Sequence, residues 1–189
     1  MKVAAIQFRC GAEYDENLTR AAALVREAAA LGATTVVLPE LFAALGRTTA
    51  MRERAEPLDG PTVQWARDLA RDTATTLMPG SLVERSGADL FNTSCVVGPD
   101  GDLVGHYRKV HLFDVDVDGA VSRESDTFTG GDRAVVVDTP DARLGLTICY
   151  DLRFGELFGA EARAGAEVIA VPSAFTAATG RDHWEVLVR

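Results

Sequence analysis

Long apolar runs are missing from this sequence, so we expect neither a membrane-spanning segment nor a secretory leader. Apolar runs such as 36–38 and 168–171 are far shorter than the about 20 residues that a transmembrane helix needs. The N-terminal segment, MKVAAIQFRCGAEYDEN, lacks the long apolar core and small-residue cleavage site of a signal peptide. We therefore expect a cytoplasmic protein with no membrane partner.

Positive charge is also scarce. The chain has 19 Lys and Arg residues against 28 Asp and Glu residues, a formal net charge of −9. Nucleic acids and anionic membranes both need a basic surface, so we expect neither as a partner. Lysine occurs only at Lys2 and Lys109. Because nearly every other basic position is arginine, Lys109 is conspicuous.

Cysteine and histidine are few and widely spaced. The cysteines are Cys10, Cys95 and Cys149, and the histidines are His106, His111 and His183. There is no CxxC pair and no HExxH pattern, so the sequence indicates neither a zinc site nor a dithiol redox centre. We expect no metal.

What is present is the composition of a globular α/β protein: 189 residues, 47% hydrophobic and 25% charged. No repeat or linker divides the chain, so we predict a single domain over 1–189. Hydrophobic periodicity and turn residues predict strands at 2–8, 34–38, 75–83, 93–97, 103–107, 134–138, 143–149 and 167–171. Helices are predicted at 15–31, from 61, at 154–164 and from 182. Alternating helices and strands, two strands being joined by a hairpin, indicate a mixed sheet.

Two segments stand apart from this pattern. The polar stretch 114–132 contains three glycines and is predicted to be a loop, and long loops often carry function. The chain ends at Arg189, within the opening turns of the helix predicted from Asp182 and without a stop signal. We therefore expect the domain to be incomplete at its C-terminal end.

Three reactive side chains follow predicted strands directly. Glu40 comes after Pro39, which cannot continue a central strand. Lys109 follows the strand 103–107, and Cys149 ends the strand 143–149. Strand ends are where α/β proteins commonly place their sites, so these groups are predicted to converge on one rim of one sheet.

These residue types fit a cysteine hydrolase. Such an enzyme needs a group that takes the thiol proton, a donor to the leaving group and a cation or N–H for the oxyanion. Histidine usually serves as the base, but no histidine here forms a recognisable Cys–His motif. A carboxylate and an ammonium are available instead.

The motifs LPELF, GHYRKVHLFDVDV, ESDTFTGGD, GLTICYDLRF and VPSAFTAATGRDHWEVLVR, in this order, resemble the carbon–nitrogen hydrolase (nitrilase) superfamily. The wording is most similar to the omega-amidase and deaminated-glutathione amidase group. The resemblance implies a four-layer α-β-β-α sandwich. It also implies a homodimer or higher homo-oligomer that forms through helices including the one after the cysteine.

The resemblance further implies a Glu–Lys–Cys triad at Glu40, Lys109 and Cys149, with a second glutamate at Glu124. Glu40 would take the proton of the thiol, and the thiolate would attack an amide carbonyl. Lys109 and the backbone N–H of Tyr150 would stabilise the oxyanion. A thioester would form and then be hydrolysed, and no cofactor is required.

Other roles stay open at this level. Glu124 would orient Lys109 or the substrate, or another acid of its loop would do so. Arg153 would bind a substrate carboxylate, or brace the turn by pairing with Asp151 or Glu156. Phe42 would line the pocket beside the catalytic glutamate, or simply pack. Cys10 and Cys95 are expected to have no role.

The leading hypothesis is an amidase that converts a small linear carboxamide to a carboxylic acid and ammonia. A nitrilase and an N-carbamoyl amino acid hydrolase are alternatives within the same superfamily. A non-catalytic fragment or assembly module that keeps the fold is the alternative from another class. A peroxide-reducing thiol ranks last because no resolving cysteine is evident.

Overall fold

A six-stranded mixed sheet forms one half of the molecule. The computed structural model describes residues 1–46, 48–117 and 120–189. The strands of this sheet are β1 (Val3–Ala5), β2 (Thr35–Val37), β3 (Thr76–Met78), β4 (Leu82–Ser86), β5 (Asp89–Val97) and β6 (Leu103–Arg108). Their order is β1-β2-β3-β5-β4, with β6 paired to β5. The first three strands are parallel, and β5 is antiparallel to β3, β4 and β6.

A smaller sheet and a hairpin complete the strands. The smaller sheet contains β9 (Val136–Asp138), β10 (Arg143–Leu146) and β11 (Val168–Ala170), in the order β11-β10-β9. Strands β10 and β11 are parallel, whereas β9 is antiparallel to β10. The hairpin consists of β7 (Asp114–Val117) and β8 (Ala120–Arg123).

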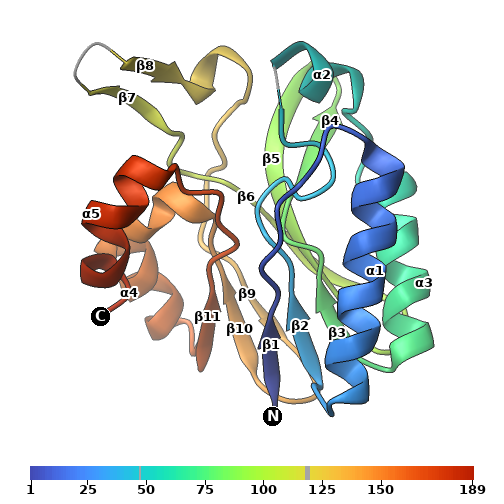
Figure 1. Ribbon diagram of the computed structural model, residues 1–189. Coiled ribbons are helices and arrows are strands. Elements are labelled where there is room, and N and C mark those ends of the chain that lie inside the picture. Colours follow the sequence, from blue (N-terminus) through green and yellow to red (C-terminus); the bar gives the residue numbers. More distant parts are fainter. Residues whose placement is uncertain (47, 118–119) are drawn as a thin grey trace.

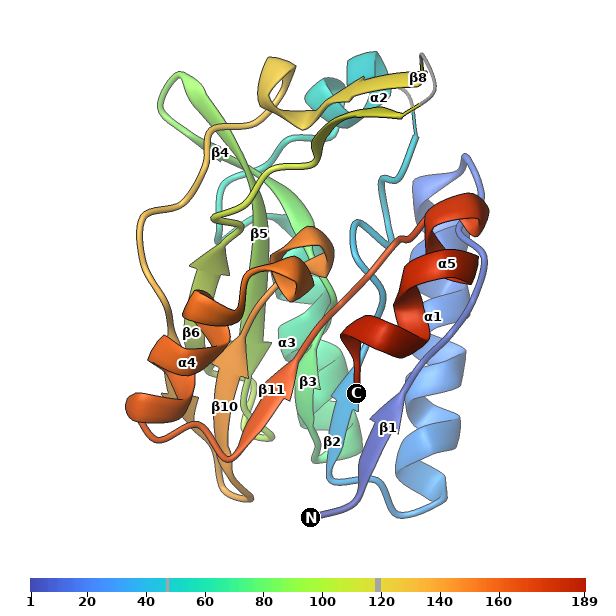
Figure 2. The ribbon, with the colours of Figure 1, turned by 90° about the vertical axis from the view of Figure 1, so that its left-hand side faces the viewer.

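Helices cover the outer faces of the two sheets. α1 (Tyr14–Ala30) and α3 (Pro61–Thr73) lie on one side, and α4 (Gly155–Arg163) and α5 (Ala177–Leu187) lie on the other (Figure 1). The view turned by 90° shows α4 beside β10 and β11 (Figure 2). The expected four-layer α-β-β-α sandwich is thus confirmed. No helix among the described residues is long and apolar enough to cross a membrane.

Side chains alternate along the strands of the larger sheet, so one set packs against the helices and the other packs between the two sheets. In β3, Leu77 packs toward α1 and α3, whereas Met78 packs between the two sheets. In β5, Val97 and Val96 are divided in the same way. The two sheets approach closely at Gly105 of β6, where a Cβ atom would overlap the side chain of Val137.

The helices bury the apolar stripes that their spacing predicts. In α1 the buried stripe includes Ala21, Ala22, Val25 and Ala28, and the chain turns at Gly32 with a φ of 86°. α3 begins with Pro61, whose missing N–H is not needed in the first turn. Its buried face includes Val63, Ala66, Leu69 and Ala70.

Several elements differ from the predictions. The strand predicted at 75–83 is two strands, because the chain turns at Gly80 with a φ of 59°. A short helix, α2 (Thr48–Glu53), was not predicted. α5 begins before residue 182, after Thr176, whose hydroxyl oxygen accepts the Thr179 N–H and caps the helix.

The predicted loop 114–132 contains more regular structure than expected. It includes the β7–β8 hairpin and a 3-10 turn, η1 (Glu124–Asp126), while residues 118–119 lie outside the described residues. The strand predicted at 143–149 ends at Leu146, and a second 3-10 turn, η2 (Cys149–Arg153), follows. Both turns start with a residue that was predicted to belong to the site.

Candidate active site

Glu40 is held at the end of β2 by a tightly packed turn. Gly80 lies so close to the Pro39 carbonyl that a Cβ atom there would overlap it. The next residue after the glutamate, Leu41, has a φ of 47°, and its N–H donates to Ser81 Oγ at 2.9 Å. Glu40 is 5% exposed. The packing of the chain against the link between β3 and β4 therefore directs this carboxylate into the interior.

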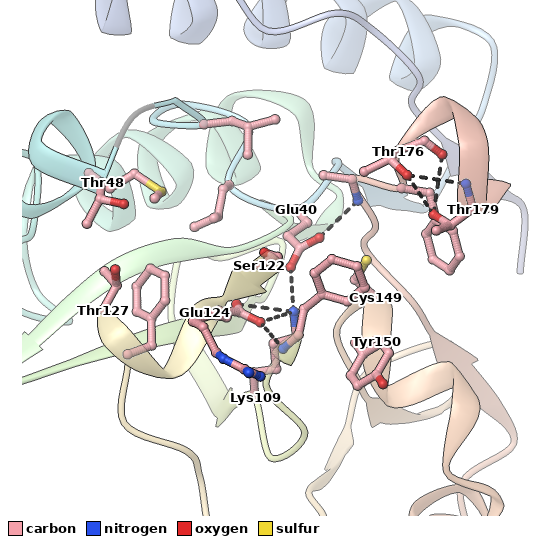
Figure 3. A pocket seen from close by; sticks show the side chains of 18 of the residues that line it. Glu40, Thr48, Lys109, Ser122, Glu124, Thr127, Cys149, Tyr150, Thr176 and Thr179 are labelled. Atoms are coloured by element: carbon pink, nitrogen blue, oxygen red, sulfur yellow. Dashed lines mark hydrogen bonds and ion pairs between the residues drawn. The ribbon is translucent and has the colours of Figure 1, made fainter. Parts of the chain in front are cut away.

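Lys109 follows β6 and extends its pairing with β5. Its N–H donates to the Asn92 carbonyl at 2.9 Å, and its side chain is 2% exposed. The ammonium Nζ lies 2.9 Å from Glu40 Oε1 and 2.9 Å from Glu124 Oε2 (Figure 3). Glu40 and Glu124, the two glutamates to which the family resemblance assigns roles, therefore share one buried cation, the Lys109 ammonium.

Backbone N–H groups fix both carboxylates. Glu124 is the first residue of η1, and its Oε2 accepts the Phe113 N–H at 2.6 Å. Glu40 Oε2 accepts the Ala174 N–H at 2.9 Å. These donors favour the ionised form of a carboxyl group.

Cys149 opens η2 in a left-handed conformation, with a φ of 48°. Its N–H donates to the Pro172 carbonyl at 2.9 Å, which ties the turn to the segment after β11. A non-glycine residue with this φ is uncommon and is held there by the surrounding structure. In Figure 3 its sulfur lies in the same pocket as Glu40 and Lys109.

Burial is the largest influence on the Cys149 thiol, and it raises the pKa. The neighbouring Glu40 carboxylate raises the pKa further, and the Lys109 ammonium offsets only part of the increase. Burial alone would lower the pKa of Lys109, but Glu40 and Glu124 together raise it above its ordinary value. The resting site therefore pairs a protonated thiol with a permanent ammonium.

Neither of the other two thiols is influenced by both a carboxylate and an ammonium. Burial raises the pKa of Cys95 to about 12, with Glu56 and Glu84 adding to the effect. Burial also raises the pKa of Cys10. A raised thiol pKa is therefore general in this chain, and the adjacent carboxylate and ammonium distinguish Cys149.

Asp151 braces the turn after the cysteine. Its fully buried carboxylate accepts the Ile148 N–H at 2.9 Å within the turn. It also accepts the Tyr107 hydroxyl at 2.8 Å and the His111 N–H at 3.0 Å. Because Tyr107 and His111 flank Lys109 in sequence, this one carboxylate connects the cysteine turn to the lysine segment.

The site opens into a pocket of about 320 Å³. Glu40, Lys109 and Cys149 lie in its wall, together with residues of α2, β8, η1 and the start of α5. Figure 3 shows Thr48, Ser122, Thr127 and Thr176 around the same space. Its size suits a small ligand rather than a polymer.

Two predicted substrate contacts line this pocket. Tyr150 and Arg153 both contribute to its wall. Arg153 Nη2 lies 2.9 Å from His183 Nδ1, and the guanidinium lies over the Tyr150 and Phe175 rings. Among the ion pairs of the described residues, none joins Arg153 to an acid, so the structure does not show the turn brace considered for it.

Two expectations need correction. Phe42 is fully buried between Phe8 and Trp65, and it is absent from the described pocket lining because its side chain points into the core beside α1 and α3.

The site also lies between the two sheets, and not at the rim of one sheet as predicted. Glu40 and Lys109 follow strands of the larger sheet, whereas Cys149 follows β10 of the smaller sheet.

Sequence reasoning missed three donors to the carboxylates. Two are the backbone N–H groups of Phe113 and Ala174, which no side-chain pattern reveals. The third is Asn92, fully buried on β5. Asn92 opens a polar run that continues through Thr93 and Ser94, so its polarity alone did not single it out, and the predicted strand began one residue later, at Thr93.

The described residues do not form a cluster of metal ligands. Across the ranges 1–46, 48–117 and 120–189, no three His, Cys, Asp or Glu side chains gather in a group suited to a metal ion. The two glutamates of the site are already joined by Lys109.

Comparison with known proteins gives a consistent result. A family model described as carbon-nitrogen hydrolase matches residues 2–189. The chain is 42% identical to omega-amidase NIT2 of Mus musculus over 189 residues, covering all of this chain and 68% of the mouse protein. It is also 42% identical to hydrolase C26A3.11 of Schizosaccharomyces pombe over 191 residues, covering 59% of that protein.

Solved structures agree with these sequence matches. Saccharomyces cerevisiae Nit3, a member of branch 10 of the nitrilase superfamily, superposes with a TM-score of 0.87 and 33% identity, over 99% of this chain and 69% of Nit3. The C. elegans NitFhit protein gives a TM-score of 0.86 and 32% identity, over 98% of this chain and 46% of NitFhit. Together with the family model, these similarities establish that the chain belongs to the carbon-nitrogen hydrolase family.

Proposed function

We propose that this chain hydrolyses a small linear carboxamide to a carboxylic acid and ammonia through a thioester on Cys149. The observation that carries the proposal is the buried Glu40 carboxylate, tied to Lys109 and adjacent to the thiol in a small pocket. The omega-amidase name of the mouse relative supports an amide as the substrate.

Proton transfer to Glu40 starts the reaction. Because the pKa of the Cys149 thiol is raised by burial, the thiol keeps its proton until a substrate carbonyl lies against it. The Ala174 N–H donates to Glu40 Oε2 and also lies beside the thiol, so we assign Oε2 as the proton acceptor. The sulfur then attacks the carbonyl carbon as the proton leaves.

The oxyanion of the tetrahedral intermediate needs donors on the side away from Glu40. The Lys109 ammonium has three N–H groups, and it already binds two carboxylates. All three face carboxylate oxygens, so we assign to the oxyanion the positive charge of Lys109 and the backbone N–H of Tyr150, near the start of η2. One such donor typically contributes about 100- to 1,000-fold in rate.

The remaining steps return the site to its starting state. Glu40 gives its proton to the departing amine, which leaves as ammonia, and the acyl group remains on Cys149 as a thioester. Glu40 next takes a proton from water, and the hydroxide attacks the thioester carbonyl. The acid is released and the thiol recovers its proton, so the sum is amide plus water to acid plus ammonia.

Arg153 favours a substrate with a carboxylate at its far end. Its guanidinium is partly exposed in the pocket wall and rests on Tyr150 and Phe175. Stacking on two rings restrains the side chain and leaves N–H groups for a bidentate contact with a carboxylate. An ω-amide of a short dicarboxylic acid would place its amide at Cys149 and its carboxylate at Arg153.

The test measures ammonia release from ω-amides, matched amides without a carboxylate, nitriles and ureido acids. We expect the ω-amides to give the highest kcat/KM, and Cys149→Ser to abolish turnover while Cys10→Ser retains it. Equal losses in the two variants would contradict the proposal. Faster turnover of nitriles or ureido acids would assign the site to one of the alternative activities.

A further inference from the structure

Asn92 is a polar side chain at a fully buried position. It lies on β5 and is 0% exposed. On the same face of the strand, the Ser94 hydroxyl donates to the Gly80 carbonyl at 2.6 Å and Val96 packs between the two sheets. Burying an amide costs free energy unless it forms hydrogen bonds, so hydrogen-bond partners must offset the cost of burying Asn92.

The amide nitrogen binds both glutamates of the site. Asn92 Nδ2 donates to Glu40 Oε1 at 3.0 Å and to Glu124 Oε1 at 3.1 Å. Lys109 Nζ donates to the same two oxygens, at 2.9 Å and 3.2 Å. Two donors and two acceptors therefore alternate in a closed ring of four hydrogen bonds.

We infer that Asn92 is a positioning residue that keeps the Glu40 carboxylate ionised and turns its second oxygen toward Cys149. With Oε1 occupied by Asn92 and Lys109, Oε2 is the oxygen left on the side of Ala174 and the thiol. The inference rests on the proposed function, in which Glu40 Oε2 accepts the thiol proton.

An amide is suited to this task because it does not titrate. The charged and titratable groups around it are Glu40, Glu124 and Lys109, with Cys149 beyond them. Two carboxylates that shared only Lys109 would repel each other, and proton uptake by one of them would relieve the repulsion. Asn92 stabilises the doubly ionised pair without becoming a competing base.

The side chain is not needed for strand pairing. The ladder between β5 and Lys109 uses the Asn92 backbone carbonyl, which any residue would supply. The side-chain oxygen Oδ1 has no hydrogen-bond partner among the described residues, so both side-chain contacts are donations to carboxylates. The Asn92 side chain therefore binds the two glutamates and takes no part in strand pairing.

The experiment compares Asn92→Leu and Asn92→Asp with the wild-type chain. Leucine removes both donors at similar size, and aspartate removes them at the same shape while adding a third carboxyl group. The control is Cys95→Ala, which lies on the same strand but on the face that packs against Val63 and Leu82. The readouts are kcat/KM for the best amide against pH and the ¹³C NMR titration of the glutamate carboxyl groups.

We expect Asn92→Leu to lower kcat about 10- to 100-fold with little change in KM, because a hydrogen bond to an ionised group is lost. The acid limb of kcat/KM and the site carboxyl titrations should both move up by about one to two pH units, and further in Asn92→Asp. Cys95→Ala should match the wild type.

Unchanged carboxyl titrations in both Asn92 variants would overturn the inference, as would an equal shift in Cys95→Ala. If one Asn92 variant does not fold, the other still decides the question. Absence of amide turnover in the wild type would instead refute the proposed function, while the NMR titration would still test whether Asn92 keeps the glutamates ionised.

Discussion

Two buried glutamates of this protein have opposite surroundings. Glu40 is 5% exposed and accepts hydrogen bonds from Lys109, Asn92 and the Ala174 N–H. Glu161, on α4, is 0% exposed, and neither of its carboxylate oxygens has a hydrogen-bond partner among the described residues. It packs so closely against Gly145 that a Cβ atom there would meet its Oε2.

The difference shows that burial alone does not make a carboxyl group reactive. Burial raises the pKa of Glu161 to about 8; a neighbouring N–H at Leu146 offsets part of this shift, and Asp151 adds to it. Glu161 is therefore held neutral below that pH. Glu40 is buried as well, but it accepts hydrogen bonds from three donors, one of them an ammonium, so the two glutamates differ in their partners and not in their burial.

The sharpest test makes the same substitution, glutamate to glutamine, at both positions. Glu40→Gln should lower kcat about 100- to 10,000-fold, because the proton acceptor is lost while the shape is kept. Glu161→Gln should leave the amide turnover unchanged. Steady-state kinetics on the two variants decides the comparison, and it fails if both lose activity to the same extent.

Removing Lys109 would make the surroundings of Glu40 more like those of Glu161 by taking away its cation. Lys109→Met leaves two buried carboxylates without their cation, and breaking a buried ion pair in this way destabilises by about 3–5 kcal/mol. The loss should be larger at pH 8 than at pH 5, where protonation relieves the repulsion.

The only other lysine of the chain provides the control for this measurement. Lys2 is exposed and donates to the Leu31 carbonyl at the end of α1. Lys2→Met should change the free energy of unfolding by no more than about 0.5 kcal/mol. Urea denaturation at both pH values measures the two effects, and equal losses would contradict the special role of Lys109.

Glu161→Gln should produce the smallest change, a gain in stability at high pH. Because the folded-state pKa of Glu161 is about 8 and the ordinary value is 4.5, the neutral carboxyl stabilises the fold below pH 4.5. This stabilisation is lost as the pH rises through about 8. The variant should therefore be more stable than the wild type by about 1–3 kcal/mol at pH 9 and nearly equal to it at pH 5.

Glu156 supplies the matched control, since it lies on the same helix but is exposed. Glu156→Gln should show no such pH-dependent difference in unfolding free energy. A gain in Glu161→Gln that is the same at pH 5 and pH 9 would show that packing, and not charge, sets the environment of Glu161.

The site was predictable where it depended on the order of residues along the chain. Glu40, Lys109 and Cys149 each follow a strand, and the structure places all three in one pocket. Glu124 came from resemblance to a family, because nothing in its own polar loop separates it from the neighbouring acids. The structure separates it by its contact with Lys109.

What escaped prediction depends on three-dimensional packing. Periodicity shows that Phe42 is apolar but not which side of the chain it faces, and it faces the helices. Strand β7 of the hairpin alternates aspartate with valine, and its acidity made it resemble a loop. Which sheet a strand joins depends on contacts between residues that are far apart in the sequence. The positions of the strand ends alone therefore could not reveal that Cys149 follows a strand of a different sheet.

In the proposed mechanism the nucleophile and the base come from separate sheets, so the rate of reaction depends on the spacing between the sheets. Any substitution in the core that spreads the layers also lengthens the path of the proton from sulfur to carboxylate. The layers approach closely where Gly105 of β6, the strand that leads to Lys109, meets Val137, and a larger side chain at this glycine would widen the gap. Interior packing would therefore influence turnover even where no side chain touches the substrate.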